Sequence, residues 1–197
     1  MTAIKEIDSS LVTVGKPVEG GCCWTSFDDN PTLPTDATTK MSTVEGFESL
    51  GELSENGFTE GKTVDTSEFK GWHGSTVLTE ATGEQNTYKM EFIEPNRAAV
   101  AKLRYGAGNV ESASDGSVTH IKGVAGSITT VPLVIDELES NGYLRRTVVR
   151  KASITSFDDV PHQRGSLMVY GMTFTAIEDD GRMFDIYRAK PAAPASV

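Results

Sequence analysis

The sequence is poor in the residues that build redox, metal and membrane sites. Its 197 residues include two cysteines, two tryptophans and three histidines. Cys22 and Cys23 are adjacent, which does not suit a disulfide between separate strands. The first ten residues hold Lys5, Glu6 and Asp8 but no apolar run long enough for a signal peptide or a membrane span. We therefore expect one soluble domain over residues 1–197 that folds without a disulfide and has no membrane partner.

Positive charge is also scarce. Lys and Arg number 18 against 28 Asp and Glu, which gives a formal net charge of -10 and a sequence pI near 4.8. A surface of this sign repels phosphates, whereas proteins that grip DNA place Lys and Arg against them. The densest cationic stretch, Arg145 to Lys151, follows acidic residues, so we expect its charges to be paired within the fold. Specific nucleic-acid binding is therefore not expected.

Motifs for catalysis or for a cofactor are missing as well. The histidines, His73, His120 and His162, are dispersed and are expected to lie exposed in loops. Gly106-Ala-Gly108 lacks the lysine of a phosphate loop and follows a helical stretch, so it indicates a helix end. Acid pairs such as Asp28-Asp29 arise readily in so acidic a chain. We predict that the protein is not an enzyme and has no catalytic residue, no cofactor and no metal.

One short self-match keeps a metal alternative open. Thr25-Ser-Phe-Asp-Asp-Asn-Pro31 recurs as Thr155-Ser-Phe-Asp-Asp-Val-Pro161. Asp and Pro favour turns for backbone reasons, so chance similarity is the simpler explanation. Paired calcium sites are the alternative.

The chain contains the turn signals of a β protein between short β-branched runs. The clearest hairpin spans Val131 to Arg150 around Asn141-Gly142, a dipeptide typical of a two-residue type I′ turn. Such a loop predicts these opposite pairs: Glu137 with Arg146, Ile135 with Val148, and Val134 with Val149. Apolar residues on both faces of this hairpin suggest contact on both sides, either in a barrel shared among subunits or at the centre of a monomeric sandwich.

Two further hairpins are predicted. One spans Ser166 to Tyr187 around Asp180-Gly181, and the other spans Ser75 to Ile93 through Thr82-Gly83. The second strand of the latter alternates Tyr88, Met90 and Phe92 inward with Lys89 and Glu91 outward. This period of two indicates an antiparallel sheet with one buried face.

One helix is expected beside these strands. Pro95 suits its first turn, Glu94 its N-cap and Gly106 its end, and residues 98–103 have high helix propensity. A shorter helical turn is expected over 67–71. Residues 15–42 are predicted to be an extended arm or loop outside the core, and residues 190–197 a flexible tail.

Three motifs together resemble a known family. They are Gly51-Glu-Leu-Ser-Glu-Asn-Gly57, then Trp72, then Tyr88-Lys-Met-Glu-Phe-Ile-Glu-Pro-Asn96 leading through the helix to Tyr105-Gly106. The pattern resembles the major tail tube proteins of siphophages that infect Gram-positive hosts. The match covers about Glu45 to Gly106, and beyond Gly106 it depends on topology.

The resemblance implies a fold and a structural role. The fold would be mainly β (α+β), an antiparallel β-sandwich with one flanking helix whose strands join an inner barrel in the oligomer. The protein would be made in the host cytoplasm and would form stacked hexameric rings in the virion tail. Its partners would be further copies of itself, a tape measure protein, and tail terminator and distal tail proteins. Genomic DNA would pass through without specific binding.

The resemblance also singles out residues. The segment between the strands near Leu53 and Ser75 would join rings, with Phe58 and Trp72 as interface residues. The strands expected to line the lumen are 45–53, 75–81, 130–139 and 143–153. Their charged hairpin residues are Asp136, Glu137, Glu139 and Arg146. The alternative function is a monomeric or trimeric β-sandwich module that binds a receptor or a carbohydrate.

Overall fold

The computed structural model describes residues 9–18, 21–126 and 128–190 and is mainly β with one α-helix. The strands are β1 (Gly15–Pro17), β2 (Cys23–Ser26), β3 (Phe47–Ser49), β4 (Leu53–Lys70), β5 (Thr76–Phe92), β6 (Val110–Ser112), β7 (Val118–Ile121), β8 (Thr130–Glu139), β9 (Leu144–Phe157), β10 (Tyr170–Ile177) and β11 (Phe184–Ala189). The helix is α1 (Ala98–Tyr105), and three 3-10 turns are η1 (Ser9–Leu11), η2 (Met41–Thr43) and η3 (Ala107–Asn109).

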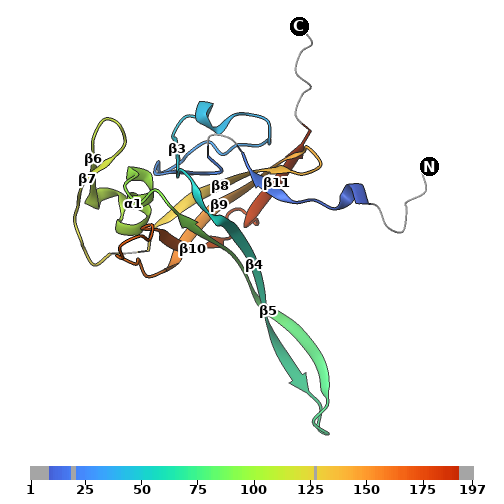
Figure 1. Cartoon of the computed structure of the whole chain (residues 1–197). Helices are drawn as coiled ribbons and strands as arrows, with labels where there is room; N and C mark the ends of the chain where they lie inside the picture. Colours follow the sequence, from blue (N-terminus) through green and yellow to red (C-terminus); the bar gives the residue numbers. More distant parts are fainter. Residues whose placement is uncertain (1–8, 19–20, 127, 191–197) are drawn as a thin grey trace.

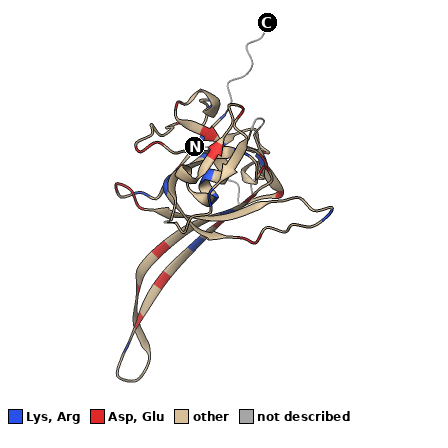
Figure 2. Cartoon of the chain, turned by 90° about the vertical axis from the view of Figure 1, so that its left-hand side faces the viewer, with Lys and Arg blue, Asp and Glu red and all other residues tan. Residues whose placement is uncertain are grey.

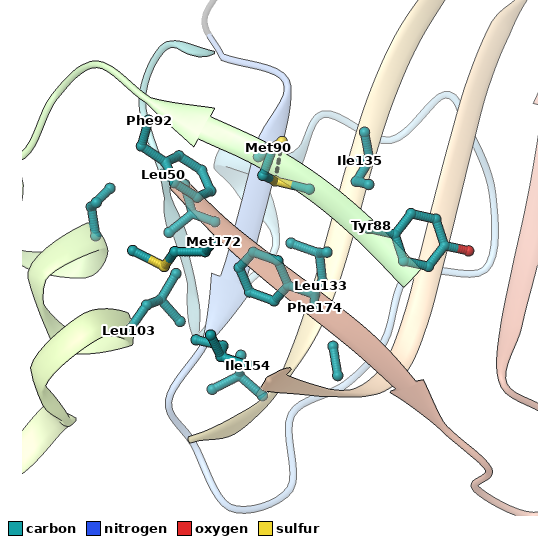
Figure 3. Close-up of a cluster of buried hydrophobic side chains, with 14 of the residues drawn as sticks. Leu50, Tyr88, Met90, Phe92, Leu103, Leu133, Ile135, Ile154, Met172 and Phe174 are labelled. Carbon is teal, nitrogen blue, oxygen red and sulfur yellow. Dashed lines mark hydrogen bonds between the residues drawn. The ribbon is translucent and has the colours of Figure 1, made fainter. Parts of the chain in front are cut away.

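Nine strands form one antiparallel sheet in the order β3-β2-β8-β9-β10-β5-β4, with β1 beside β8 and β11 beside β9. The sheet bends over itself, so that side chains of β5 and β10 face those of β8 across a shared core (Figure 3). Phe92 and Phe174 meet edge to face with ring centroids 6.4 Å apart. The predicted mainly β fold, with packed antiparallel layers and one flanking helix, is confirmed.

The helix covers one end of this core. Ala98, Ala99, Val100, Ala101 and Leu103 are buried, and α1 lies beside the small β6-β7 hairpin (Figure 1). Gly106 ends the helix with φ 87°, a left-handed conformation that glycine adopts without strain. The predicted end is therefore confirmed. The predicted start is not.

The helix starts at Ala98 because the backbone before it is extended. Arg97 is the N-cap, with φ -75° and ψ 127°. Glu94, the predicted N-cap, instead accepts hydrogen bonds from Arg97 Nε at 2.8 Å and from the Glu52 amide at 2.9 Å. The predicted helical turn over 67–71 is also wrong, because β4 continues to Lys70.

The hairpin around Asn141-Gly142 is present, but its register differs by one residue from the prediction. The Glu139 amide donates to the Tyr143 carbonyl, which leaves a loop of Ser140, Asn141 and Gly142. In this loop only Gly142 has positive φ, 83°, as in a three-residue turn that ends in a glycine bulge. The observed pairs are Val134 with Val148, Ile135 with Thr147, Asp136 with Arg146, and Glu137 with Arg145.

The other two predicted hairpins are wrong. Asp180 and Gly181 do form a tight turn, with φ of 54° and 76°, but β10 and β11 do not pair with each other. Both strands pair with the same edge of β9. Strand β10 pairs with residues 151–157 of β9, and β11 pairs with residues 144–149. Thr82-Gly83 is no turn either, because β5 runs through it, with a bulge opposite β4. The predicted inward alternation of Tyr88, Met90 and Phe92 is confirmed, since all three are buried.

The segment predicted to lie outside the core contributes a strand to the main sheet. Within residues 15–42, β2 pairs with β8, and Cys22 and Cys23 belong to the main core as free thiols. Residues 27–46 connect β2 to β3, include η2, and cover the second face of β8 and β9. There Met41 packs against Val134 and Val148. The apolar residues on both faces of the β8-β9 hairpin are thus buried by the chain itself. Of the predicted tail, residues 191–197 lie outside the described residues.

Candidate functional site

The most prominent surface feature is a two-stranded arm that projects from the body (Figure 1). It is formed by the distal parts of β4 and β5, which remain paired from Phe58 with Met90 to Lys70 with Thr76. Near the body, Met90 is buried and Phe58 packs against the main core. From Thr63 outward on β4 nearly every side chain is exposed. The arm is therefore a ribbon that projects into solvent from a fixed base.

A tight turn at the end of the arm presents an aromatic side chain. The Gly71 amide donates to the Ser75 carbonyl and the Gly74 amide to the Gly71 carbonyl, both at 2.8 Å. Gly74 has φ 82°, so this turn has the same three-residue form as the turn at Gly142. Trp72, the first loop residue, is 99% exposed.

Further apolar side chains lie just behind the tip. Phe69 and Leu78 are paired across the two strands, so they share one face of the ribbon. They are 49% and 50% exposed, and neighbouring Val77 is 67% exposed. Large exposed apolar groups that cluster in this way mark an interaction surface.

The two predicted interface residues occupy different positions. Trp72 is at the tip, free of the body, whereas Phe58 is at the base and is half-buried in its own chain. The sequence prediction placed this segment between two strands and expected a helical turn over 67–71 within it. In the structure it is a continuous β ribbon, and its pattern of Thr, Val and Glu around Gly-Trp-His-Gly is the signal that could have shown this.

Acidic side chains outnumber basic ones along the arm (Figure 2). Glu84 pairs with Lys62 at 2.9 Å, and hydrogen bonds from Asn86 and Lys62 lower the pKa of Glu84 below its usual value. Glu68 and Glu80 are exposed nearer the tip. The arm therefore carries net negative charge together with its apolar end.

The charged residues predicted on the β8-β9 hairpin form ion pairs with neighbouring strands or with each other. Arg146 pairs with Asp136 rather than with Glu137, because the register differs by one residue. Glu137 instead accepts from Arg145 Nη1 at 2.7 Å. Glu139 is buried and accepts from Arg188 Nε at 2.9 Å, and this guanidinium lowers the pKa of Glu139.

The rest of the cationic stretch is paired within the fold, as expected. Asp179 accepts from Arg150 at 3.2 Å and lies 2.6 Å from Lys151 Nζ. These two cations lower the pKa of Asp179. The densest basic segment therefore presents little uncompensated charge to an anionic ligand.

Groups suited to catalysis or metal binding are not assembled in the described residues. His73, His120 and His162 are exposed and separate. Within residues 9–18, 21–126 and 128–190, no group of three His, Cys, Asp or Glu side chains could hold a metal ion. A hydrogen bond with Cys22, together with burial, raises the pKa of Cys23, which does not suit a nucleophile. No helix among these residues is long and apolar enough to cross a membrane.

Comparison with known families agrees with a structural role. The chain belongs to the family described as Phage tail tube protein, whose model matches residues 28–189. It is therefore a structural component of a bacteriophage tail, and its family implies self-assembly into a tube. No curated relative matches the chain.

Proposed function

We propose that this protein forms hexameric rings that stack into the hollow tail tube, through which genomic DNA passes to the host during ejection. The family match over residues 28–189 carries the proposal. A tube protein must bind its own copies, and the exposed arm offers a surface for contact between successive rings. Phe58 anchors the arm at its base and Trp72 makes the contact at its tip.

The partners follow from this role. The tube is assembled around a tape measure protein and meets tail terminator and distal tail proteins at its ends. The virion is a siphophage of a Gram-positive host, as the sequence resemblance suggests. The net charge of -10 supports passage of DNA without binding, because a mainly acidic wall does not attract phosphates.

The experiment is negative-stain microscopy of the purified protein over a range of concentrations, together with its size in solution. Rings or tubes with a central channel and sixfold rotational symmetry are expected. A discrete monomer or trimer at all concentrations would contradict the proposal and favour the alternative, a receptor- or carbohydrate-binding module. Rings of another symmetry would contradict the hexamer alone.

A further inference from the structure

The end of the body opposite the arm contains a pocket of about 400 Å³ beneath residues 37–42. Its apolar walls include Val18, Trp24, Met41 and Leu144. The arm and the loop containing η2 project from opposite ends of the body in Figure 1, and Figure 2 shows the same arrangement. An apolar projection and an apolar pocket thus lie at opposite ends of one chain.

We propose that Trp72 at the arm tip of one copy inserts into this pocket of the next copy along the tube. The inference rests on the proposed function and identifies the receiving surface. Two different patches on the same chain make a head-to-tail contact, and when the patches lie at opposite ends of the chain such a contact continues from copy to copy instead of closing into a ring. Such a contact gives an open-ended stack.

The size and chemistry of the pocket fit an indole. Pockets of roughly 300 to 1,000 Å³ with apolar walls and a few polar groups are typical of sites for small-molecule ligands. The charged residues in the wall, Arg145 and Arg146, are neutralised by Glu137 and Asp136. An inserted side chain would therefore meet no uncompensated charge from these residues, and burial of a tryptophan is a common source of binding energy at interfaces.

The rim of the pocket is held in shape before any partner binds. Arg146 donates to the carbonyls of Asp36 at 2.9 Å and Thr39 at 2.8 Å. The Asp36 carboxylate accepts from the amides of Thr38 and Thr39. A preformed pocket costs little ordering on binding, and this favours a tight contact.

Charge supports the same pairing. Lys40 is exposed at the rim, and the exposed charges near the arm tip are Glu68, Glu80 and Lys70, which leave this part of the arm with net negative charge. When Trp72 is inserted, an acidic ribbon approaches a basic side chain. The contact should therefore weaken as salt screens these charges.

The first test is a crosslink between copies. A His73→Cys/Ser42→Cys chain places one thiol at the arm tip and one at the pocket rim, while the native Cys22 and Cys23 are buried. Mild oxidation of assembled tubes should give a ladder of linked chains under denaturing conditions. The control, His73→Cys/Ser166→Cys, places the second thiol beside Leu167, another exposed apolar residue, and should give no ladder. A ladder from the control alone would overturn the inference. The absence of a ladder from both chains, when tubes are present, would also overturn it.

The second test fills the pocket mouth. Ser42 is exposed and lines the pocket, so Ser42→Trp should leave the subunit folded and raise the concentration needed for tubes by at least about tenfold. Thr32→Trp adds the same side chain at an exposed position of the same loop and should have little effect. Trp72→Ala should match Ser42→Trp. Tubes that form normally from Ser42→Trp would refute the contact, whereas failure of the wild-type chain to form tubes would count against the proposed function instead.

Discussion

Arg146 donates two hydrogen bonds to the carboxylate of Asp136, from Nε to Oδ1 at 2.6 Å and from Nη2 to Oδ2 at 2.8 Å. Only 2% of the arginine is exposed. The same guanidinium donates to two carbonyls of the loop that covers it, those of Asp36 and Thr39. One buried side chain therefore joins the central hairpin to the loop over its second face.

We expect this pair to be costly to break. Removing one partner from a buried ion pair commonly costs about 3–5 kcal/mol because the other charge remains buried alone. Asp136→Asn and Arg146→Met should each lower the melting temperature strongly, while Arg145→Gln, at a more exposed pair, should lower it less. Calorimetry of the three variants tests this. Equal melting temperatures for Arg146→Met and the wild-type chain would contradict the role assigned to Arg146.

The loop that Arg146 holds should make stability depend on pH. Hydrogen bonds from the Thr39 amide and hydroxyl, and from those of Thr38, hold the pKa of Asp36 well below its usual value. A depressed folded-state pKa stabilises the folded state above the unfolded pKa, about 3.9, and that stabilisation is lost as pH falls below it. Melting temperatures between pH 7 and pH 2.5 should therefore fall less steeply for Asp36→Ala than for the wild-type chain. Asp29→Ala, an exposed residue of the same loop, is the control and should follow the wild-type slope.

The sequence predicted turns more reliably than it predicted the partners of the strands beside them. Asn141-Gly142 and Asp180-Gly181 both form turns with their glycines at positive φ, whereas Thr82-Gly83 is part of the continuous strand β5. The register at the first turn depends on whether the loop has two or three residues, and the dipeptide fits either. The strands beside the second turn, β10 and β11, pair with the free edge of β9 instead of with each other. This choice depends on a strand that is distant in sequence, so local sequence patterns do not predict it.

The candidate site was predictable only in part. Trp72 stood out because a large aromatic residue in a polar, glycine-containing segment is unusual, and the structure places it at the arm tip with 99% of it exposed. The pocket was not predictable, because its walls come from three distant segments that contain Val18, Met41 and Leu144. Apolar residues on both faces of β8 and β9 suggested contact on both sides, either between subunits or at the centre of a monomeric sandwich. The loop carrying Met41 covers one of those faces, so intrachain packing accounts for the pattern.

Removing the arm should separate folding from stacking. Thr63 and Gln85 are paired on the ribbon, so Val64–Glu84 can be replaced by an Asn-Gly turn that joins them. Because the removed residues are almost all exposed, we expect a melting temperature close to that of the full chain and no tubes by electron microscopy. Tubes of normal length from the shortened chain would show that the arm does not join rings.

Folding should not need a metal ion. The core is built from apolar side chains of β2, β5, β8, β9 and β10, and a chain of this size can bury enough surface without a metal. A chelator such as EDTA should therefore leave the melting temperature unchanged, with calcium addition as the reciprocal control. A large drop in EDTA, reversed by calcium, would instead support cation binding at the acidic turns after Thr25 and Thr155.

The proposed tube would have to pass DNA without holding it. A duplex in a channel meets every ring, so even weak attraction per ring would add up, and net negative charge on the wall avoids this. The acidic residues of the strands expected at the lumen differ in whether they form ion pairs. Asp136, Glu137 and Glu139 are all ion-paired with arginines, so their contribution is nearly neutral. The negative balance should come from exposed acids.

Glu45 and Glu52 are the exposed acids for which this role is proposed, because Glu48 pairs with Lys102 and Glu80 lies on the projecting arm. Replacing Glu45 and Glu52 with Lys in assembled tubes should slow DNA ejection at low salt, and moderate salt should restore much of the rate by screening. Glu178→Lys, at an exposed position outside those strands, should eject at the wild-type rate. Gln in place of Lys at the same two positions should give an intermediate rate, because it removes repulsion without adding attraction. Ejection times that do not differ among the variants at either salt concentration would show that lumen charge does not govern passage.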